Sequence, residues 1–174
     1  AWLEWATVQE GILSSSSIMI WTFVGVLGWT FNEYWLHRWL FHLPPSRNRM
    51  LVNIQFMLHG YHHEHPNDPG RLVAPLILSW PIAIVLAVAY WALLGALWKP
   101  LFAGTTLGYL AYDWIHYYTH HGRPMGRLGR YLRRLHISHH YRDATTNFGL
   151  SSPLWDYVFQ TVRDDPRAQP LQEE

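Results

Sequence analysis

Residues Leu135–Trp155 read LHISHHYRDATTNFGLSSPLW and contain three histidines with the spacing HxxHH. A second HxxHH triplet occurs upstream, an HxxxxH pair precedes that triplet, and an HxxxH pair lies between the two triplets. These four clusters contain ten of the chain's twelve histidines, namely His37, His42, His59, His62, His63, His116, His120, His136, His139 and His140. We expect the rest of the fold to bring the four clusters to one place.

The spacing of these histidines is helical. Residues four apart lie about 40° apart around a helix, and residues three apart lie about 60° apart in the other direction. Each HxxHH triplet is therefore expected to direct its three imidazoles at one point beside the helix. The HxxxxH pair differs, because residues five apart are separated by about 140° on a regular helix. We therefore expect His42 to lie just past the end of a helix that Pro44 terminates.

Ten imidazoles are too many for one metal ion, which takes about four to six ligands, and they suit two ions. The chain has no Cys, so any metal must be bound by nitrogen or oxygen. Neutral imidazole is a ligand for iron, zinc, copper and nickel. His65 and His121 fall outside the four clusters, and we expect both to be surface residues.

The composition indicates a membrane protein. Lys and Arg total 13 against 12 Asp and Glu, and this balance argues against a nucleic-acid partner. The chain has 11 Trp and 10 Tyr, side chains that concentrate at membrane interfaces. Apolar residues gather in three stretches, 18–41, 72–97 and 101–118, and about 20 such residues cross a bilayer. The sequence predicts an all-α integral membrane bundle of about three to four spanning helices, with a helical cap that holds a dinuclear metal centre.

The connections and ends of the chain complete this prediction. Lys99-Pro100 is too short for anything but a tight hairpin between the second and third apolar stretches. Residues 1–13 are predicted to form an interfacial helix. We assign residues 1–162 to the membrane-bound domain and residues 163–174 to a disordered polar tail.

Positive charge predicts the orientation in the membrane. Six Arg residues lie between Gly122 and Arg142, next to the histidine clusters, whereas Lys99 marks the other side. By the positive-inside rule, the clusters lie on the cytoplasmic side. The membrane would be a bacterial inner membrane or, in a eukaryote, that of the endoplasmic reticulum.

Acidic and tyrosine side chains flank the clusters. Four carboxylates are candidates to accept the second imidazole N–H and so fix the tautomer, namely Glu64, Asp113, Asp143 and Asp156. Helix capping or plain surface charge explains them equally well. Four tyrosines are candidates to line a substrate entrance, namely Tyr61, Tyr112, Tyr117 and Tyr141. The pattern favours an aromatic belt for these tyrosines over an entrance.

Four stretches resemble the fatty acid hydroxylase superfamily, and most closely its fatty acid 2-hydroxylases. They read WTFNEYWLHRWLFH, HGYHHEHPNDPGRLVAP, YLAYDWIHYYTHH and LHISHHYRDATTNFGLSSPLWD. The resemblance runs from about Trp29 to Thr161. It implies that the ten clustered histidines hold two iron ions, which zinc can replace in purified protein, and that no catalytic residue is needed beyond these ligands.

The reaction that the resemblance implies is hydroxylation of an acyl chain at carbon 2, the α-carbon, either in a free fatty acid or in a sphingolipid such as ceramide. O2 is the co-substrate, so the protein would be a monooxygenase. Eukaryotic members often carry a fused cytochrome b5 domain, for which the 36 residues before His37 leave no room. We therefore expect electrons from a separate donor of the cytochrome b5 or ferredoxin type. The family usually has two spanning helices before the first cluster, whereas this chain has room for one and a short segment.

Two alternatives stay open. One is a sterol or carotenoid oxidase or desaturase of the same superfamily, because the flanking residues separate these enzymes less well than they indicate the metal site. The other is a histidine-rich membrane protein that binds or moves zinc without redox chemistry. A transporter would place its ligands near the middle of the bilayer, whereas these histidines are predicted at helix ends.

Overall fold

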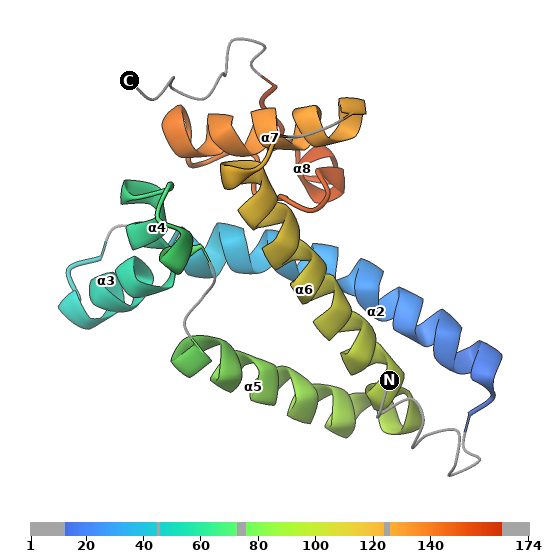
Figure 1. Ribbon diagram of the computed structural model, residues 1–174. Helices are drawn as coiled ribbons and strands as arrows, with labels where there is room; N and C mark the ends of the chain where they lie inside the picture. The colour runs from blue at the N-terminus through green and yellow to red at the C-terminus, as the bar shows by residue number, and fades with distance from the viewer. Residues whose placement is uncertain (1–12, 45, 73–75, 124–125, 165–174) are drawn as a thin grey trace. The chain divides into compact units, whose positions relative to one another are not determined.

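The computed structural model describes residues 13–44, 46–72, 76–123 and 126–164, apart from the side chain of residue 78. In this part of the chain the fold is all-helical, as predicted, and contains no strand. The α-helices are α2 (Ser15–Trp35), α3 (Arg49–Gln55), α4 (Tyr61–Glu64), α5 (Leu76–Leu94), α6 (Trp98–His121), α7 (Gly126–Tyr141) and α8 (Leu154–Val158), as Figure 1 shows. The other elements are π-helical turns at Leu36–Phe41 and Phe56–Gly60 and 3₁₀ turns at Pro69–Arg71 and Gly95–Leu97.

The chain divides into two compact units. The first unit comprises residues 1–31 and 75–111, and the second comprises residues 32–74 and 112–174. Helices α2 and α6 each contribute residues to both units. All ten clustered histidines belong to the second unit, which therefore contains the candidate site.

Glycines allow two helices of the first unit to touch through their backbones. A β-carbon added at Gly104 on α6 would lie 2.0 Å from the carbonyl oxygen of Thr22 on α2. One added at Gly25 on α2 would lie 2.3 Å from a backbone oxygen of α6. One turn further along α6, Gly108 leaves room for the side chain of Trp29. The absence of a side chain at these two glycines of α6 therefore permits the close approach of the helices.

The reversal between α5 and α6 occurs at Gly95–Leu97 and not at Lys99-Pro100, so the predicted position of the hairpin turn is wrong. Gly95 has a φ of +53°, a left-handed conformation that glycine adopts without a β-carbon clash. Lys99-Pro100 instead belongs to the first turn of α6, where the missing N–H of proline is not needed. Across the hairpin, the hydroxyl oxygens of Tyr90 and Thr105 lie 3.3 Å apart.

Many apolar side chains of the first unit face outward. Ile77 on α5 is 76% exposed, and Met19 on α2 is 68% exposed. Within the described residues, one helical stretch, Ser79–His121, is long and apolar enough by length and composition to cross a membrane, and it includes the reversal at Gly95–Leu97. The predicted number of spanning helices, about three to four, therefore stays a prediction.

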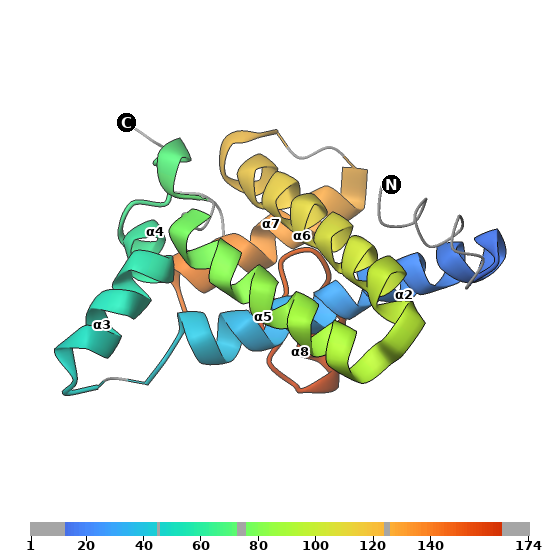
Figure 2. The same cartoon turned by 90° about the horizontal axis from the view of Figure 1, so that it is seen from below.

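In the second unit, α7 is buried at its C-terminal end. The five consecutive residues from Leu135 to His139 are each at most 4% exposed, so this part of the helix is enclosed on every side, whereas its first turn is exposed. The loop after α7 and the short helix α8 lie beside the end of α2 (Figures 1 and 2), where the backbone N–H of Ser151 donates to Glu33 at 2.8 Å.

Most of the two predicted end segments falls outside the described residues: 1–12 of the interfacial helix and 165–174 of the tail. Arg163 and Asp164 are described and make hydrogen bonds, while the predicted disorder of the tail stays a prediction. The backbone N–H of Arg163 donates to Oδ1 of Asn147 at 2.8 Å. The carboxylate of Asp164 accepts two hydrogen bonds, at 2.5 and 2.7 Å, from one arginine of α7.

We predict that Gly104→Ala and Gly25→Ala lower the stability of the first unit by about 1–3 kcal/mol, because the added methyl group overpacks a backbone contact. Gly28→Ala on α2 is the matched control, since a β-carbon there meets nothing within 4 Å. It should leave stability unchanged or raise it by up to about 1 kcal/mol. Thermal unfolding of the detergent-solubilised protein, followed by circular dichroism, measures the difference. Equal melting temperatures for Gly104→Ala and Gly28→Ala would contradict the close contact.

Candidate metal centre

The ten clustered histidines come together in two groups of five, in which one ring nitrogen from every member lies within 4.8 Å of the others. Group A consists of His37, His42, His59, His63 and His139. Group B consists of His62, His116, His120, His136 and His140. His65 and His121 are exposed and lie outside both groups, as expected.

Each HxxHH triplet is divided between the two groups. In the first triplet, His59 and His63 belong to group A, whereas His62 belongs to group B. The triplet on α7 shows the reverse division, with only its middle histidine, His139, in group A. The expectation that a triplet converges on one point is therefore wrong. Histidines four apart share a direction, and the middle one points about 60–100° away from them, which directs it to the other group.

A π-helical turn aligns His37 with His42. The turn spans Leu36–Phe41, and the backbone N–H of His42 donates to the carbonyl oxygen of His37 at 3.2 Å. Hydrogen bonds in a π-helix join residues five apart, so the two side chains lie on one side instead of about 140° apart. Their Nε2 atoms are 3.2 Å from each other. His42 lies just past the end of the helix, as predicted, but the widened turn before it was not predicted.

The separations between ring nitrogens fit a shared metal ion. In group A the Nε2 atoms of His139 and His42 are 3.0 Å apart, and in group B those of His116 and His62 are 2.9 Å apart. Nitrogens bound at about 2.0–2.1 Å to one ion, at tetrahedral or octahedral angles, lie about 2.8–3.4 Å from each other. The residues present therefore fit two metal ions, one in each group.

Two imidazoles of group A have their proton positions fixed by the backbone. Nδ1 of His37 lies 2.6 Å from the carbonyl oxygen of Phe148, and Nδ1 of His139 lies 2.7 Å from that of Thr146. A carbonyl oxygen only accepts hydrogen bonds, so both Nδ1 atoms carry the proton. Both Nε2 atoms then present a lone pair to group A, and converging lone pairs favour a bound cation.

Burial keeps these histidines neutral. Desolvation lowers the pKa of His139 and that of His136 well below the usual range. It also lowers the pKa of His62 to about 2 and that of His63 to about 3. Neutral imidazole is the form that binds a metal, so at neutral pH no proton has to be displaced from these ligands.

Backbone carbonyls, and not the predicted carboxylates, accept the second N–H of His37 and His139. The prediction that a neighbouring carboxylate fills this role is therefore wrong for these two histidines. The physical reason is that the chain leaves α7 as a loop whose carbonyl oxygens already lie against both rings. Backbone carbonyls are present at every residue, so no pattern in the sequence points to these two.

The candidate carboxylates lie in different surroundings. Asp156 is fully buried and accepts hydrogen bonds from the loop backbone, whereas Asp143 accepts one at 2.9 Å within the turn that follows it. Glu64 is exposed, and Asp113 is half-buried on α6. A fifth acid, Glu33, was not among the candidates, although it is 3% exposed and also binds the loop. Glu33 could have been identified from the sequence, because it is an acid inside an apolar stretch and lies four residues before a clustered histidine.

The second imidazole nitrogens of group B differ from those of group A in their hydrogen bonding. Four of its members have a buried Nδ1 atom without a hydrogen-bond partner in the described part of the chain: His62, His116, His136 and His140. In group A the corresponding atoms of His37 and His139 have backbone acceptors. The two groups therefore share their ligand chemistry but differ in how their rings are oriented.

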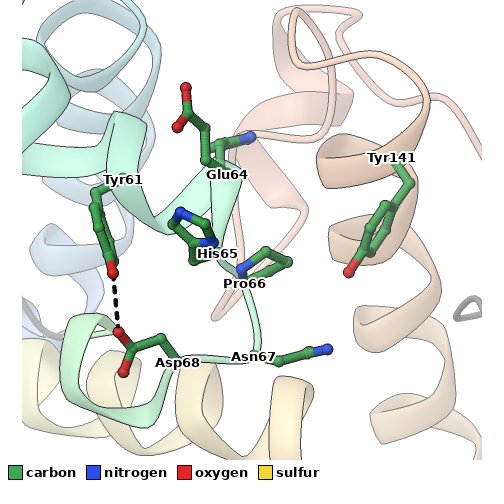
Figure 3. Close-up of a pocket in the computed structure, with 8 residues that line it drawn as sticks. Tyr61, Glu64, His65, Pro66, Asn67, Asp68 and Tyr141 are labelled. Carbon is green, nitrogen blue, oxygen red and sulfur yellow. Dashed lines mark hydrogen bonds between the residues drawn. The ribbon is translucent and has the colours of Figure 1, made fainter. Parts of the chain in front are cut away.

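A pocket of about 430 Å³ has one group A histidine, His63, in its lining. Figure 3 shows other residues that line it. Its lining consists of Tyr61, His63, Glu64, His65, Pro66, Asn67, Asp68 and Tyr141. Tyr141 on α7 faces the His65–Asp68 segment across the pocket. Tyr61 and Tyr141 are two of the four tyrosines considered for a substrate entrance, and the other two, Tyr112 and Tyr117, lie outside this lining. Because one group A histidine, His63, is part of the lining, the pocket borders that group.

Comparison with known proteins gives consistent matches. The family model named fatty acid hydroxylase matches residues 22–161. Fatty acid 2-hydroxylase of Mus musculus is 40% identical over 167 residues, which are 90% of this chain and 43% of the relative. Dihydroceramide fatty acyl 2-hydroxylase FAH2 of Arabidopsis thaliana is 41% identical over 144 residues, which are 79% of this chain and 58% of the relative. The chain thus spans less than two thirds of the length of these relatives.

A solved structure is similar along the whole chain. It is that of full-length scs7p, in which only the hydroxylase domain is visible, with a TM-score of 0.85 and 34% sequence identity. The match covers 99% of this chain and 64% of that chain. All ten clustered histidines lie inside the range that the family model matches. The chain therefore belongs to the fatty acid hydroxylase family.

Proposed function

We propose that this protein hydroxylates carbon 2 of fatty acyl chains, free or within a sphingolipid such as ceramide, at a centre of two metal ions. The observation that carries the proposal is the convergence of ten histidines into two groups of five. The activities for which its relatives are named, fatty acid 2-hydroxylase and dihydroceramide fatty acyl 2-hydroxylase, support the reaction and the substrate class.

Groups A and B would each hold one ion, with no ligand needed beyond the ten histidines. We propose iron as the native metal. Zinc generally binds imidazole sites more tightly than ferrous iron, so it can replace iron during purification. When bound, the two irons would supply the redox chemistry that puts one oxygen atom of O2 into a C–H bond, while two electrons from a separate donor of the cytochrome b5 or ferredoxin type and two protons reduce the other oxygen atom to water.

The chain's own side chains hold the imidazoles in place and keep water from them. The ring of Phe41 stacks on His59 with 5.1 Å between centroids, and Phe148 lies edge-on to His139 at 5.8 Å. Apolar rings at this distance exclude water from that side of group A. A low local dielectric strengthens the attraction between a bound cation and the ring nitrogens.

The polar head of the substrate would occupy the pocket beside group A. Its lining offers the hydroxyl of Tyr141, the amide of Asn67 and the carboxylate of Asp68, which suit the amide and hydroxyl groups of a ceramide. Binding of the head there explains why a carbon close to the carboxyl end would be presented. The outward apolar side chains of the first unit suit the hydrocarbon of a bilayer, with the histidines on the cytoplasmic side.

The alternatives considered from the sequence are less well supported. The relatives described above are named for fatty acyl 2-hydroxylation, which favours that reaction over oxidation of sterols or carotenoids. A non-redox zinc protein would share the histidine groups. The proposed enzyme would turn over with iron, whereas a non-redox zinc protein would not. This difference can be measured directly.

Iron-loaded protein is expected to convert an acyl or ceramide substrate into its 2-hydroxy product in the presence of O2 and a reductant. The zinc-loaded protein should not, because zinc does not change oxidation state. Mass spectrometry of the product, with isotopically labelled O2 as the oxygen source, reports both the position and the origin of the hydroxyl group. Turnover by an iron-free zinc form would rule out the proposed mechanism.

Each histidine group should lose its own metal when one member is removed. His139→Ala for group A and His62→Ala for group B are each expected to lower metal content from about two ions per chain toward one. Turnover should fall by more than about 100-fold, since even a partner outside the ligand set costs about 10–100-fold. His65→Ala and His121→Ala are the controls and should keep both ions, because these exposed residues lie outside both groups. The measurement is elemental analysis of metal per chain. Two ions per chain with full turnover in His139→Ala would refute the assignment of His139 as a ligand of group A.

A further inference from the structure

The middle of the loop between α7 and α8, residues 146–150, is buried, and carboxylates bind its backbone. Phe148 is 4% exposed and Leu150 is 2% exposed. The backbone N–H groups of four consecutive residues, from Phe148 to Ser151, all donate to carboxylate oxygens. The carbonyl oxygens of the same loop accept hydrogen bonds from imidazoles of group A.

Asp156, at the start of α8, holds the first half of the loop. Its carboxylate accepts from the backbone N–H of Phe148 at 2.8 Å and from that of Gly149 at 2.6 Å. A third hydrogen bond, at 2.7 Å, comes from the hydroxyl of Thr161. Asp156 is 0% exposed, so these three donors replace the water that the carboxylate loses on burial.

Glu33, on α2, holds the second half. One of its carboxylate oxygens accepts from the backbone N–H of Leu150 at 2.5 Å and from that of Ser151 at 2.8 Å. The other oxygen accepts from the hydroxyl of Ser151. Glu33 is 3% exposed and lies one helical turn before His37, so the same segment contributes a loop anchor and a group A histidine.

A short chain of hydrogen bonds links these acids to group A. The N–H of Phe148 donates to Asp156, and the carbonyl oxygen of Phe148 accepts from Nδ1 of His37 at 2.6 Å. Two residues earlier, the carbonyl oxygen of Thr146 accepts from Nδ1 of His139 at 2.7 Å. The orientation of both rings therefore depends on the position of a loop that the two carboxylates fix.

We propose that Glu33 and Asp156 are positioning residues for the metal site of group A. Through the loop they hold His37 and His139 in the Nδ1–H tautomer, with both Nε2 lone pairs directed at that site. The assignment deepens the proposed function and rests on its metal centre. It does not extend to group B, where four Nδ1 atoms have no hydrogen-bond partner in the described part of the chain.

An amide side chain can reproduce the hydrogen bonds of Glu33 but not those of Asp156. Both oxygens of Asp156 accept from backbone N–H groups, so in Asp156→Asn an amide NH2 faces a backbone donor whichever way it turns. In Glu33→Gln the amide oxygen can take both backbone N–H groups, and the NH2 can donate to the hydroxyl of Ser151. Asp156→Asn and Glu33→Ala should therefore disturb group A, whereas Glu33→Gln should restore it.

The experiment measures metal affinity in the full chain, solubilised in detergent. Cobalt(II) is titrated against a chelator, and its visible absorption spectrum reports ligand geometry independently of turnover. In Asp156→Asn and Glu33→Ala we expect one of the two sites to lose about 10–100-fold in affinity and to change its spectrum, while the other site is unaffected. Glu33→Gln should behave as the parent protein does. Asp164→Asn is a further control, because that carboxylate binds only Arg134 at the surface among its described contacts.

Circular dichroism checks that each variant is folded. If Asp156→Asn and Glu33→Ala do not fold, Thr161→Val and Ser151→Ala decide the question, since each removes one hydroxyl donor and keeps both acids. They should release metal from one site several-fold faster than the parent. Parent affinity and spectrum in every folded variant, or equal weakening of both sites, would overturn the proposal. A parent protein that binds no metal would overturn the proposed function as well.

Discussion

Lone pairs of ring nitrogens converge in the interior of the second unit, and the rest of that unit is arranged around this constraint. Burial keeps the imidazoles neutral, so the groups do not repel one another as cations would, but neutral rings with facing lone pairs still favour a bound cation. The constraint is geometric as well as electrostatic. In the other tautomer, Nε2 would carry an N–H where the site needs a lone pair, so the tautomer of a ligating ring matters.

In group A the tautomers are specified by backbone carbonyls, and the carbonyls are in turn positioned by buried acids. Burying a carboxylate costs free energy unless hydrogen bonds replace its water. Asp156 and Glu33 meet this condition with backbone N–H groups and hydroxyls, so these two buried acids stabilise a single loop conformation. The backbone N–H groups of an irregular loop are thereby paired, as those inside a helix are.

The first unit shows the opposite distribution of polarity. Its helices touch through Gly25 and Gly104, while large apolar side chains such as Ile77 and Trp91 face outward. In water this arrangement would leave a large apolar surface unfavourably hydrated, whereas in hydrocarbon it costs nothing and the close backbone contact supplies the packing. This distribution agrees with the membrane location proposed for the protein.

The sequence by itself determined the all-helical class, the ten histidines that come together and the two that do not, because helical spacing and apolar stretches are properties of the chain alone. It could not determine how each HxxHH triplet is divided between groups A and B, since the histidines that lie near His62 or His139 depend on where the other helices lie. The π-helical turn that aligns His37 with His42 also depends on tertiary contacts, because the same residues would form an ordinary helix at no greater local cost. The acceptors of the loop are backbone atoms that every sequence contains, so only the tertiary structure selects the carbonyls of Thr146 and Phe148 for this role.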